Sequence, residues 1–396
     1  MSFDLMGEFN KIVDKEGLGK ESTMFTVDTG IDLFDFRNGK VEGDDLLTGL
    51  NVGKVTTFVG NPGSGKTSLA VQAGWNAVKN VPNGLMYIYD FENASSYSRL
   101  QAITGASMDE IQKKVQIFSS DISVEKLYKF IRGLAKIKVE NRSQLEIDSG
   151  RKDANGNPIM MLPPTIIVID SWSAMYSDSI ADISNEEFQN GNMSGAQDAK
   201  LNKMFLKGSI AAMQKSNISL YIVAQFSTKV ETGPIKKAAT LNYLGQDENI
   251  SGGKYCIYIA DTLVKLTASS KLEPDKDFGI KGFFSRCKFI KSRSNEAGSE
   301  ITLVFEQKTG FNNILTNFNF CKDMKLLKGS PRAYYFEGAE DYKFTQKTFV
   351  DVYNKNPEFA EWFDNMCKDM YMSFIYDPTG YDNLEVTDDN EEEIDE

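Results

Sequence analysis

Short apolar runs alternate with amphipathic stretches along most of the chain. Runs of β-branched and apolar residues predict buried strands at residues 55–59, 85–90, 115–118, 165–170, 218–224, 255–259, 262–267, 283–290 and 301–306. Apolar positions at helical spacing predict helices at residues 66–79, 94–103, 107–113, 123–139 and 197–215. Strands that are apolar throughout are typical of a parallel sheet covered by helices on both faces. The pattern therefore predicts an α/β fold with a mostly parallel central sheet.

Two polar insertions interrupt this alternation. Residues 141–164 carry the turn sequence Asn155-Gly156-Asn157-Pro158 and end in two prolines, which predicts a surface hairpin. Residues 227–254 form a long polar segment directly after an apolar strand. Because structureless segments of this length are uncommon inside a compact domain, we expect the second one to be functional or disordered.

The pattern also divides the chain into four parts. Residues 1–27 contain apolar positions at helical spacing between Ser2 and Asp14, which predicts a short N-terminal helix that must dock on something. Residues 28–318 form the predicted core, and residues 319–380 form a small, aromatic-rich, helical C-terminal lobe. Residues 381–396 form an acidic tail that we expect to be disordered, with eight acids and no base from residue 385 onward. Such a tail serves either as an interaction or regulatory segment, or only to keep the protein in solution.

Composition narrows the chemistry. The 396 residues are 41% hydrophobic and contain neither a membrane-spanning apolar run nor a signal peptide, so we expect a cytoplasmic globular protein. The four cysteines form no CxxC pair, and we expect them to be reduced core residues rather than disulfide or zinc ligands. Histidine is absent, so any general base must be a carboxylate.

One motif points to a nucleotide. The octapeptide Gly60-Asn61-Pro62-Gly63-Ser64-Gly65-Lys66-Thr67 is a complete phosphate-binding loop, and it lies between a predicted strand and a predicted helix that continues at Ser68. Glycines let the backbone N–H groups of such a loop point at phosphate oxygens, while Lys66 adds a positive charge and Thr67 a hydroxyl for Mg²⁺. The sequence therefore predicts a nucleoside triphosphate site.

Two further strands end in acids. Asp170 ends the strand 165–170, where it could hold Mg²⁺, although a strand-terminal aspartate can also cap the following turn. The strand 85–90 leads into Asp90-Phe91-Glu92. Because the carboxyl ends of parallel strands line the ligand crevice, we expect Glu92 near the terminal phosphate as the general base. The alternative is that Glu92 only caps the following helix, a role that Asp90 could also fill.

These motifs together resemble those of RecA-type homologous recombinases over residues 28–310. The resemblance rests on the phosphate-binding loop and on Tyr89-Asp90-Phe91-Glu92, Val168-Ile169-Asp170-Ser171, Val223-Ala224-Gln225, Gly252-Gly253, Ala260-Asp261-Thr262 and Ile290-Lys291-Ser292-Arg293. It implies a RecA-like P-loop NTPase core that uses ATP and Mg²⁺. It also implies a filament on single-stranded DNA, which pairs that DNA with a homologous duplex and exchanges strands, with a single-strand-binding protein and a mediator as partners.

The resemblance also assigns roles to residues. Glu92 matches the family's catalytic glutamate, and Gln225 matches a polar position that couples the terminal phosphate to DNA. Lys291 and Arg293 match a basic pair that reaches the phosphates of the neighbouring subunit. The alternative is that they are ordinary solvated basic residues beyond a strand. Tyr97 and Arg99 resemble the segment that contacts adenine, but they follow Glu92 two residues sooner than in the family.

Two DNA-binding loops are implied at residues 176–197 and 227–254. The second contains basic, glycine and aromatic residues suited to single-stranded DNA, namely Lys229, Lys236, Lys237, Tyr243, Gly252, Gly253 and Lys254. The first is acidic, with Lys200 and Lys203 just beyond it. Two alternatives remain open: a hexameric replicative helicase with the same core, and a nucleotide-switched mediator or scaffold that binds DNA.

Overall fold

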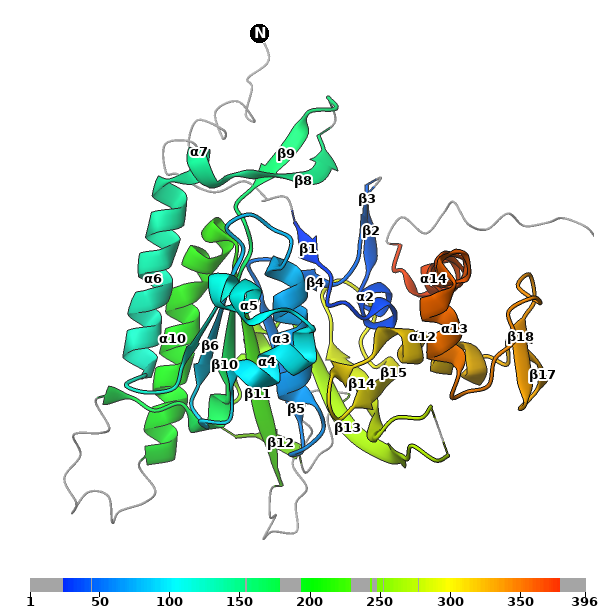
Figure 1. Ribbon diagram of the computed structural model, residues 1–396. Coiled ribbons are helices and arrows are strands. Elements are labelled where there is room, and N and C mark those ends of the chain that lie inside the picture. The colour runs from blue at the N-terminus through cyan, green and yellow to red at the C-terminus, as the bar shows by residue number, and fades with distance from the viewer. Residues whose placement is uncertain are drawn as a thin grey trace, which may run out of the picture.

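The computed structural model describes residues 24–377 except residues 44, 154, 179–193, 229–242, 244–247, 252 and 277. Its centre is a ten-stranded sheet with the strand order β16-β15-β14-β13-β5-β11-β10-β6-β7, in which β12 pairs with β11 (Figure 1). The strands are β5 (Val55–Gly60), β6 (Leu85–Asp90), β7 (Val115–Phe118), β10 (Thr165–Asp170), β11 (Ile218–Thr228), β12 (Glu248–Ile250), β13 (Thr262–Leu272), β14 (Gly282–Lys291), β15 (Glu300–Glu306) and β16 (Gly310–Phe311).

The sheet has a parallel half and an antiparallel half. Strands β13, β5, β11, β10, β6 and β7 are mutually parallel, whereas β13, β14, β15 and β16 pair antiparallel. The predicted α/β class with a mostly parallel central sheet is confirmed. The carboxyl edge is the end of the sheet at which the parallel strands finish, and the amino edge is the end at which they start.

Alternation along each strand builds two separate cores. In β10, Ile166 and Val168 join one hydrophobic cluster, while Ile167 and Ile169 join another. The first face is covered by α3 (Lys66–Val78), α4 (Tyr97–Thr104) and α5 (Met108–Lys114), and the second by α6 (Val124–Glu140), α10 (Ser194–Ser216) and α11 (Tyr255–Ile259) (Figure 1). Each fully buried aliphatic side chain contributes about 1.5–3 kcal/mol. The two clusters therefore hold the helices firmly against the strands.

One predicted strand is wrong. Residues 255–259 form the short helix α11, in which Cys256 and Ile257 are buried while Tyr258 is exposed. An uninterrupted apolar run of five residues fits either a buried strand or a buried helix, because periodicity cannot separate the two at this length. Here the run packs against β5 and α10, and this tertiary context favours a helix.

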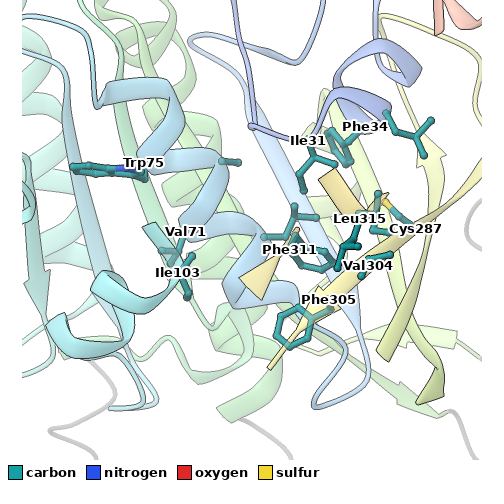
Figure 2. Close-up of a cluster of buried hydrophobic side chains, with 14 of the residues drawn as sticks. Ile31, Phe34, Val71, Trp75, Ile103, Cys287, Val304, Phe305, Phe311 and Leu315 are labelled. Carbon is teal, nitrogen blue, oxygen red and sulfur yellow. The ribbon is translucent and has the colours of Figure 1, made fainter. Parts of the chain in front are cut away.

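The first cluster continues beyond the sheet into the C-terminal part of the chain. Figure 2 shows Trp75 and Val71 of α3 on one side and Phe311 and Leu315 on the other. The cluster takes in α2 (Asp32–Arg37), α12 (Asn313–Asp323), α13 (Phe349–Lys355) and α14 (Pro357–Tyr371). The predicted boundary between residues 318 and 319 falls within α12, and the division into core and lobe stays a prediction.

Four two-stranded sheets lie outside the central sheet in the described part of the chain. They are β1 (Thr26–Val27) with β4 (Leu50–Asn51), β2 (Lys40–Glu42) with β3 (Asp45–Leu47), β8 (Ile147–Lys152) with β9 (Pro158–Met161), and β17 (Leu327–Ser330) with β18 (Ala333–Phe336). The β8–β9 pair confirms the hairpin predicted for residues 141–164, and the four-residue helix α7 (Arg142–Leu145) precedes it. The short 3-10 turns Trp172–Ala174 and Met372–Phe374 complete the described elements.

All four cysteines are buried free thiols, as expected. Burial raises the pKa of Cys256 to about 12 and also raises the pKa of Cys287. The sulfur atoms of Cys321 and Cys367 lie 3.7 Å apart between α12 and α14. In the part of the chain that is described, no helix is long and apolar enough to cross a membrane.

Candidate nucleotide site

The strand register brings the sequence-predicted residues into one row at the carboxyl edge. Gly60 of β5 is level with Gln225 of β11, and Asp170 of β10 is level with both Val223 of β11 and Asp90 of β6. The phosphate-binding loop, Asp170, Glu92 and Gln225 therefore leave neighbouring strands side by side. This is the position where open parallel sheets bind ligands.

The loop has the backbone that a phosphate cradle needs. Gly63 and Gly65 have φ values of +76° and +92°, in the left-handed region that favours glycine. A Cβ atom on Gly65 would also lie 2.8 Å from the Phe311 ring. The helix α3 begins at Lys66, so the unpaired N–H groups and positive dipole end of a long helix face the loop.

Lys66 lies inside this cradle. Its Nζ donates to the carbonyl oxygen of Asn61 at 2.8 Å, and the Ser64 hydroxyl donates to the same oxygen at 2.8 Å. Burial lowers the pKa of Lys66, while the carboxylates of Asp170 and Glu92 act in the opposite direction. A partly desolvated cation that forms no ion pair with any residue the structure describes is well placed to take up phosphate.

Thr67 and Asp170 form the candidate metal pair. The Thr67 hydroxyl donates to Asp170 Oδ2 at 2.8 Å, and Asp170 is 3% exposed. Burial raises the pKa of Asp170 to about 6, and the neighbouring carboxylates Glu92 and Asp90 add to the rise. A buried carboxylate that lacks a full counter-charge, next to a hydroxyl oxygen at a phosphate cradle, fits Mg²⁺, which prefers oxygen ligands and phosphates. In the described residues, no cluster of three or more His, Cys, Asp or Glu could hold a metal by itself.

The structure separates the roles of Asp90 and Glu92. Asp90 is fully buried, and its carboxylate accepts hydrogen bonds from the backbone N–H groups of Glu92, Ala94 and Ser95 at 3.3, 3.2 and 2.6 Å. Asp90 therefore fixes the turn, and Ser96 rather than Glu92 caps α4. Glu92 Oε1 instead accepts from the Ser171 hydroxyl at 2.5 Å and from Gln225 Nε2 at 3.2 Å. The Glu92 carboxylate thus faces the row of site residues.

A cavity of about 790 Å³ opens beside the phosphate loop. One wall is the segment from Gly63 to Ser68 together with Arg99, and the other comes from the β13–β14 hairpin and the end of β15. Phe283 lies in this second wall, stacked on Phe305 with ring centroids 4.5 Å apart. Phe283 is a candidate for contact with a nucleotide base that sequence reasoning missed. No spacing relates it to the loop, which lies more than two hundred residues earlier.

Arg99 and Tyr97 lie on the same helix but point to different places. Arg99 donates to the carbonyl oxygens of Gln307 at 3.0 Å and Lys308 at 2.8 Å, and more weakly to the Ser68 hydroxyl at 3.4 Å. It therefore borders the cavity. The Tyr97 hydroxyl is 3.5 Å from the carbonyl oxygen of Val115, and its ring packs against the first hydrophobic cluster. The role of Tyr97 in base binding stays a prediction.

Lys291 and Arg293 lie at the amino edge, away from the loop of their own chain. Lys291 is paired with Leu263, which is level with Thr57 of β5. The Arg293 N–H donates to the Asp261 carbonyl oxygen, and the Asp261 N–H donates to the carbonyl oxygen of Val55, the first residue of β5. Lys291 Nζ donates to the Tyr258 carbonyl at 2.7 Å, and its pKa is lowered, chiefly by burial and then by Arg293. The fold does not bring these cations to the phosphate loop.

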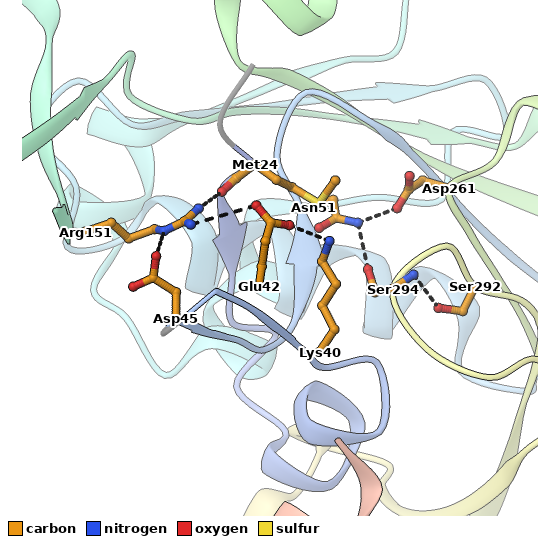
Figure 3. A network of polar contacts seen from close by, with 9 residues as sticks. All are labelled: Met24, Lys40, Glu42, Asp45, Asn51, Arg151, Asp261, Ser292 and Ser294. Carbon is orange, nitrogen blue, oxygen red and sulfur yellow. Dashed lines mark hydrogen bonds and ion pairs between the residues drawn. The ribbon is translucent and has the colours of Figure 1, made fainter. Parts of the chain in front are cut away.

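A hydrogen-bond network holds the segment that carries these cations (Figure 3). Asn51 Nδ2 donates to Asp261 Oδ2 at 2.6 Å and to the Ser294 hydroxyl at 2.8 Å, and the Ser294 N–H donates to Ser292 Oγ at 3.1 Å. Asn295 Nδ2 donates at 2.7 Å to the carbonyl oxygens of both Gly39 and Phe374. The basic segment is therefore fastened to the core and to the C-terminal end of the described chain.

The predicted DNA-binding residues are only partly described. Lys200 and Lys203 are exposed on α10, and Lys203 Nζ lies 5.9 Å from the centroid of the Tyr255 ring. Tyr243 is exposed with Lys288 Nζ 5.8 Å from its ring centroid, Gly253 accepts from Trp172 Nε1 at 3.2 Å, and Lys254 precedes α11. Lys229, Lys236, Lys237 and Gly252 lie outside the described residues. DNA binding by this set stays a prediction.

Part of the chain is similar to a known DNA repair and recombination protein. No protein-family model matches the chain. The chain is 41% identical over 76 residues to the DNA repair and recombination protein RadB of Methanosphaera stadtmanae. The match covers 19% of this chain and 32% of RadB, so the chain spans about a third of the length of the curated relative that it matches. This similarity supports a relationship to the RecA-type family, with which the α/β fold is consistent.

Proposed function

We propose that the protein is an ATP-dependent DNA recombinase that forms a helical filament on single-stranded DNA and catalyses homologous pairing and strand exchange. Its reaction is DNA-dependent hydrolysis of ATP to ADP and phosphate. Its partners are single-stranded DNA, a homologous duplex, a single-strand-binding protein and a mediator, in the cytoplasm of the cell. We further propose that the protein resembles the phage recombinase UvsX. The similarity to RadB, whose name assigns it to DNA repair and recombination, supports this class of function.

The residues at the carboxyl edge have separate roles in hydrolysis. The loop N–H groups and Lys66 bind phosphate oxygens, and Thr67 with Asp170 would hold Mg²⁺, which supplies charge neutralisation at the phosphates. Glu92 is the general base toward the attacking water, because Asp90 caps the turn and Asp170 is paired with Thr67 at the metal position. Its hydrogen bond with Gln225 at 3.2 Å connects the base to β11, which continues into the second predicted DNA loop.

One observation carries the proposal: the residues predicted for the site lie at the two opposite edges of one sheet. Residues that bind and activate lie at the carboxyl edge, whereas the basic pair Lys291 and Arg293 lies at the amino edge. Such a pair can reach a phosphate only from a neighbouring copy. A heterologous contact between these two edges repeats along an axis, which generates a filament or a ring. Assembly and hydrolysis are then coupled, as with an arginine finger supplied in trans.

A subunit-mixing experiment tests this division. Glu92→Gln removes the base but leaves the basic pair, and the double variant Lys291→Ala with Arg293→Ala does the reverse. Each alone should be inactive in DNA-stimulated ATP hydrolysis. In an equal mixture, about a quarter of the random interfaces combine an intact base with an intact basic pair, so activity should return to about that share. The matched control mixes Glu92→Gln with Lys66→Ala, both defective at the carboxyl edge, and should restore nothing. If the first mixture also stays inactive, the trans site is wrong.

Electron microscopy with ATP and single-stranded DNA separates the alternatives. A helical filament supports the recombinase. A closed ring that unwinds a forked duplex selects the hexameric helicase. DNA binding that responds to nucleotide, without turnover and without ordered assembly, selects the mediator or scaffold.

A further inference from the structure

A groove of about 510 Å³ lies at the amino edge, at the opposite end of the parallel strands from the nucleotide site. Its walls come from residues that precede β5, β10 and β11, from the ends of α6 and α10, and from β9 of the inserted hairpin. Its apolar surface includes Phe25, Val139, Ile159 and Met160. Val139 and Met160 are exposed large hydrophobic residues, 44% and 43% accessible.

The rim of this groove is positively charged. Lys54, Arg142 and Lys215 line it, and no Asp or Glu is among its lining residues. Arg142 pairs with Glu146 at 2.5 Å, but neither Lys54 nor Lys215 forms an ion pair with any residue that the structure describes. In a chain with a net charge of −12, an apolar groove rimmed by unpaired lysines is unusual. It fits an extended segment that combines acids with apolar residues.

The hairpin that forms one wall is fixed in place (Figure 3). Arg151 of β8 pairs with Asp45 at 2.6 Å and with Glu42 at 3.8 Å, and it donates to the carbonyl oxygen of Met24, which itself lines the groove. Glu42 also pairs with Lys40 at 2.6 Å. Because the guanidinium joins three separate segments, the groove is a formed feature of the fold rather than a gap beside a loose loop.

The C-terminal end of the described chain is attached close to this groove. The Val41 N–H donates to the Tyr376 carbonyl at 3.0 Å, and the Tyr376 N–H donates to Gly39 at 3.3 Å. Tyr376 thus lies beside Lys40 in β2, the strand whose Glu42 pairs with Arg151. The chain therefore continues toward residue 378 from a point about 7 Å along β2 from the Arg151 network.

We propose that the acidic C-terminal segment, residues 381–396, docks in this groove on the same chain. The segment carries eight acids from residue 385 onward, together with Leu384, Val386 and Ile394, so it matches both the rim and the apolar surface. The eight residues from 378 to 385 span up to about 27 Å when extended, which is enough to pass Arg151 and reach the groove. A short tether gives an effective concentration on the order of millimolar, so even a weak contact is occupied.

Two other segments of the chain are less suited to the groove. Residues 1–23 lead directly into Met24, but they carry three lysines among five acids and offer little charge complementarity. The acidic residues Asp182, Glu186 and Glu187 follow β10 in the sequence, and β10 ends at the carboxyl edge, the opposite end of the sheet from the groove. Docking of the C-terminal segment does not depend on the proposed function, because it needs neither nucleotide nor DNA.

Photo-crosslinking in the full chain tests the docking. The crosslinking residue p-benzoylphenylalanine replaces Met160, and after irradiation the linked tryptic fragment is identified by mass spectrometry. Because Lys368 is the last tryptic site, residues 369–396 form one diagnostic fragment. We expect this fragment in a species that migrates as a monomer. The same residue at Met204, which is exposed on α10, should not capture it.

Charge reversal sharpens the result. Lys54→Glu with Lys215→Glu should lower the yield of the 369–396 crosslink about tenfold, whereas Lys113→Glu with Lys207→Glu, on α5 and α10, should leave it unchanged. If the reversed variant does not fold, the wild-type groove crosslink measured from low to high salt replaces it, and its yield should fall as salt rises. Capture of residues 1–23, capture in a dimeric species, or a yield indifferent to both charge and salt would overturn the proposal.

Discussion

The buried carboxylates at the two edges of the central sheet lie in different surroundings. At the carboxyl edge, burial raises the pKa of Asp170 to about 6 and lowers the pKa of Lys66, so each is held in surroundings that disfavour its charge. At the amino edge, Asp261 is as buried as Asp170, but Asn51 donates to it at 2.6 Å and its backbone N–H is bonded to Val55. The carboxyl edge holds charged groups where burial disfavours their charge, whereas the amino edge hydrogen-bonds its buried carboxylate and leaves a neutral oxygen, Asn51 Oδ1, without a partner among the described residues.

The difference indicates which edge receives a ligand. Uncompensated buried charges cost free energy in the empty protein and are recovered when phosphate and a metal ion arrive. A network that hydrogen-bonds its buried carboxylate avoids the larger cost of an unpaired charge and keeps its members in place. The carboxyl edge is therefore built for binding and chemistry, while the amino edge is built to hold Lys291 and Arg293 at fixed positions.

The largest effect is expected from the carboxyl edge. Lys66→Ala should abolish ATP hydrolysis, and Glu92→Gln should reduce kcat about 10²- to 10⁴-fold with nucleotide binding retained, because only the base is lost. Steady-state ATPase assays with single-stranded DNA, and a nucleotide-binding titration, measure both. Asp90→Asn serves as a contrast, since it should chiefly affect folding through the turn that Asp90 caps. Unchanged hydrolysis in Glu92→Gln would assign the base elsewhere.

The next effect concerns the basic pair at the amino edge. Lys291→Ala with Arg293→Ala should reduce DNA-stimulated turnover about 10³-fold while the monomer still binds nucleotide, because the cations act on the neighbour's phosphates. Turnover with and without DNA, alongside monomer binding of a fluorescent ATP analogue, gives the two readouts. Retained stimulation by DNA would contradict a site completed in trans.

Asp170→Asn should separate stability from activity. The pKa of Asp170 lies above its unfolded value, so its ionised form destabilises the folded protein at pH 7 by about 3 kcal/mol. This cost should disappear as the pH falls from about 6 to about 4. The variant should therefore be more stable than the wild type at pH 7 in denaturant titrations without nucleotide, with little difference near pH 4. It should nevertheless be inactive in ATP hydrolysis. A loss of stability at pH 7 would contradict the free-energy cost assigned to burying the ionised carboxylate.

A smaller stability change is expected when the amino-edge network is broken. Asn51→Leu removes the donor to the buried Asp261 carboxylate and to Ser294, and should cost about 2 kcal/mol in the free energy of unfolding. Because Ser294 adjoins Arg293, DNA-stimulated turnover should fall as well. Ser294→Ala, which leaves the Asp261 contact intact, should cost less. Equal stability of Asn51→Leu and the wild type would show that the two edges treat buried polar groups alike.

The smallest effect distinguishes two rings near the cavity. Phe283→Ala should weaken ATP affinity by about 1–2 kcal/mol if its ring contacts the base. Tyr97→Ala should instead lower the thermal midpoint, because its ring packs on the first cluster. Calorimetric titration of a slowly hydrolysed ATP analogue measures the affinity. The reverse pattern would restore Tyr97 as the base-binding residue.

The sequence predicts the sheet better than it predicts the cavity. Strand identity follows from local periodicity, as in Thr165–Asp170, and parallel register then places Asp170 beside Asp90 and Gln225 beside Gly60 without further information. The segment Tyr255–Ile259 fails because five apolar residues carry no usable period. The wall that contains Phe283 depends on how the β13–β14 hairpin folds back toward Gly63, which is a long-range packing result that no motif encodes.

The four buried thiols have a practical consequence for time-resolved work. Because Cys256 and Cys287 are shielded and their pKa values are raised, and because Cys321 and Cys367 face each other inside the C-terminal packing, alkylating dyes should leave the native cysteines untouched. A single engineered thiol at an exposed position such as Lys200 or Met204 can then carry a fluorophore without prior removal of any native residue. Energy transfer between two such labels would report neighbouring protomers as they meet.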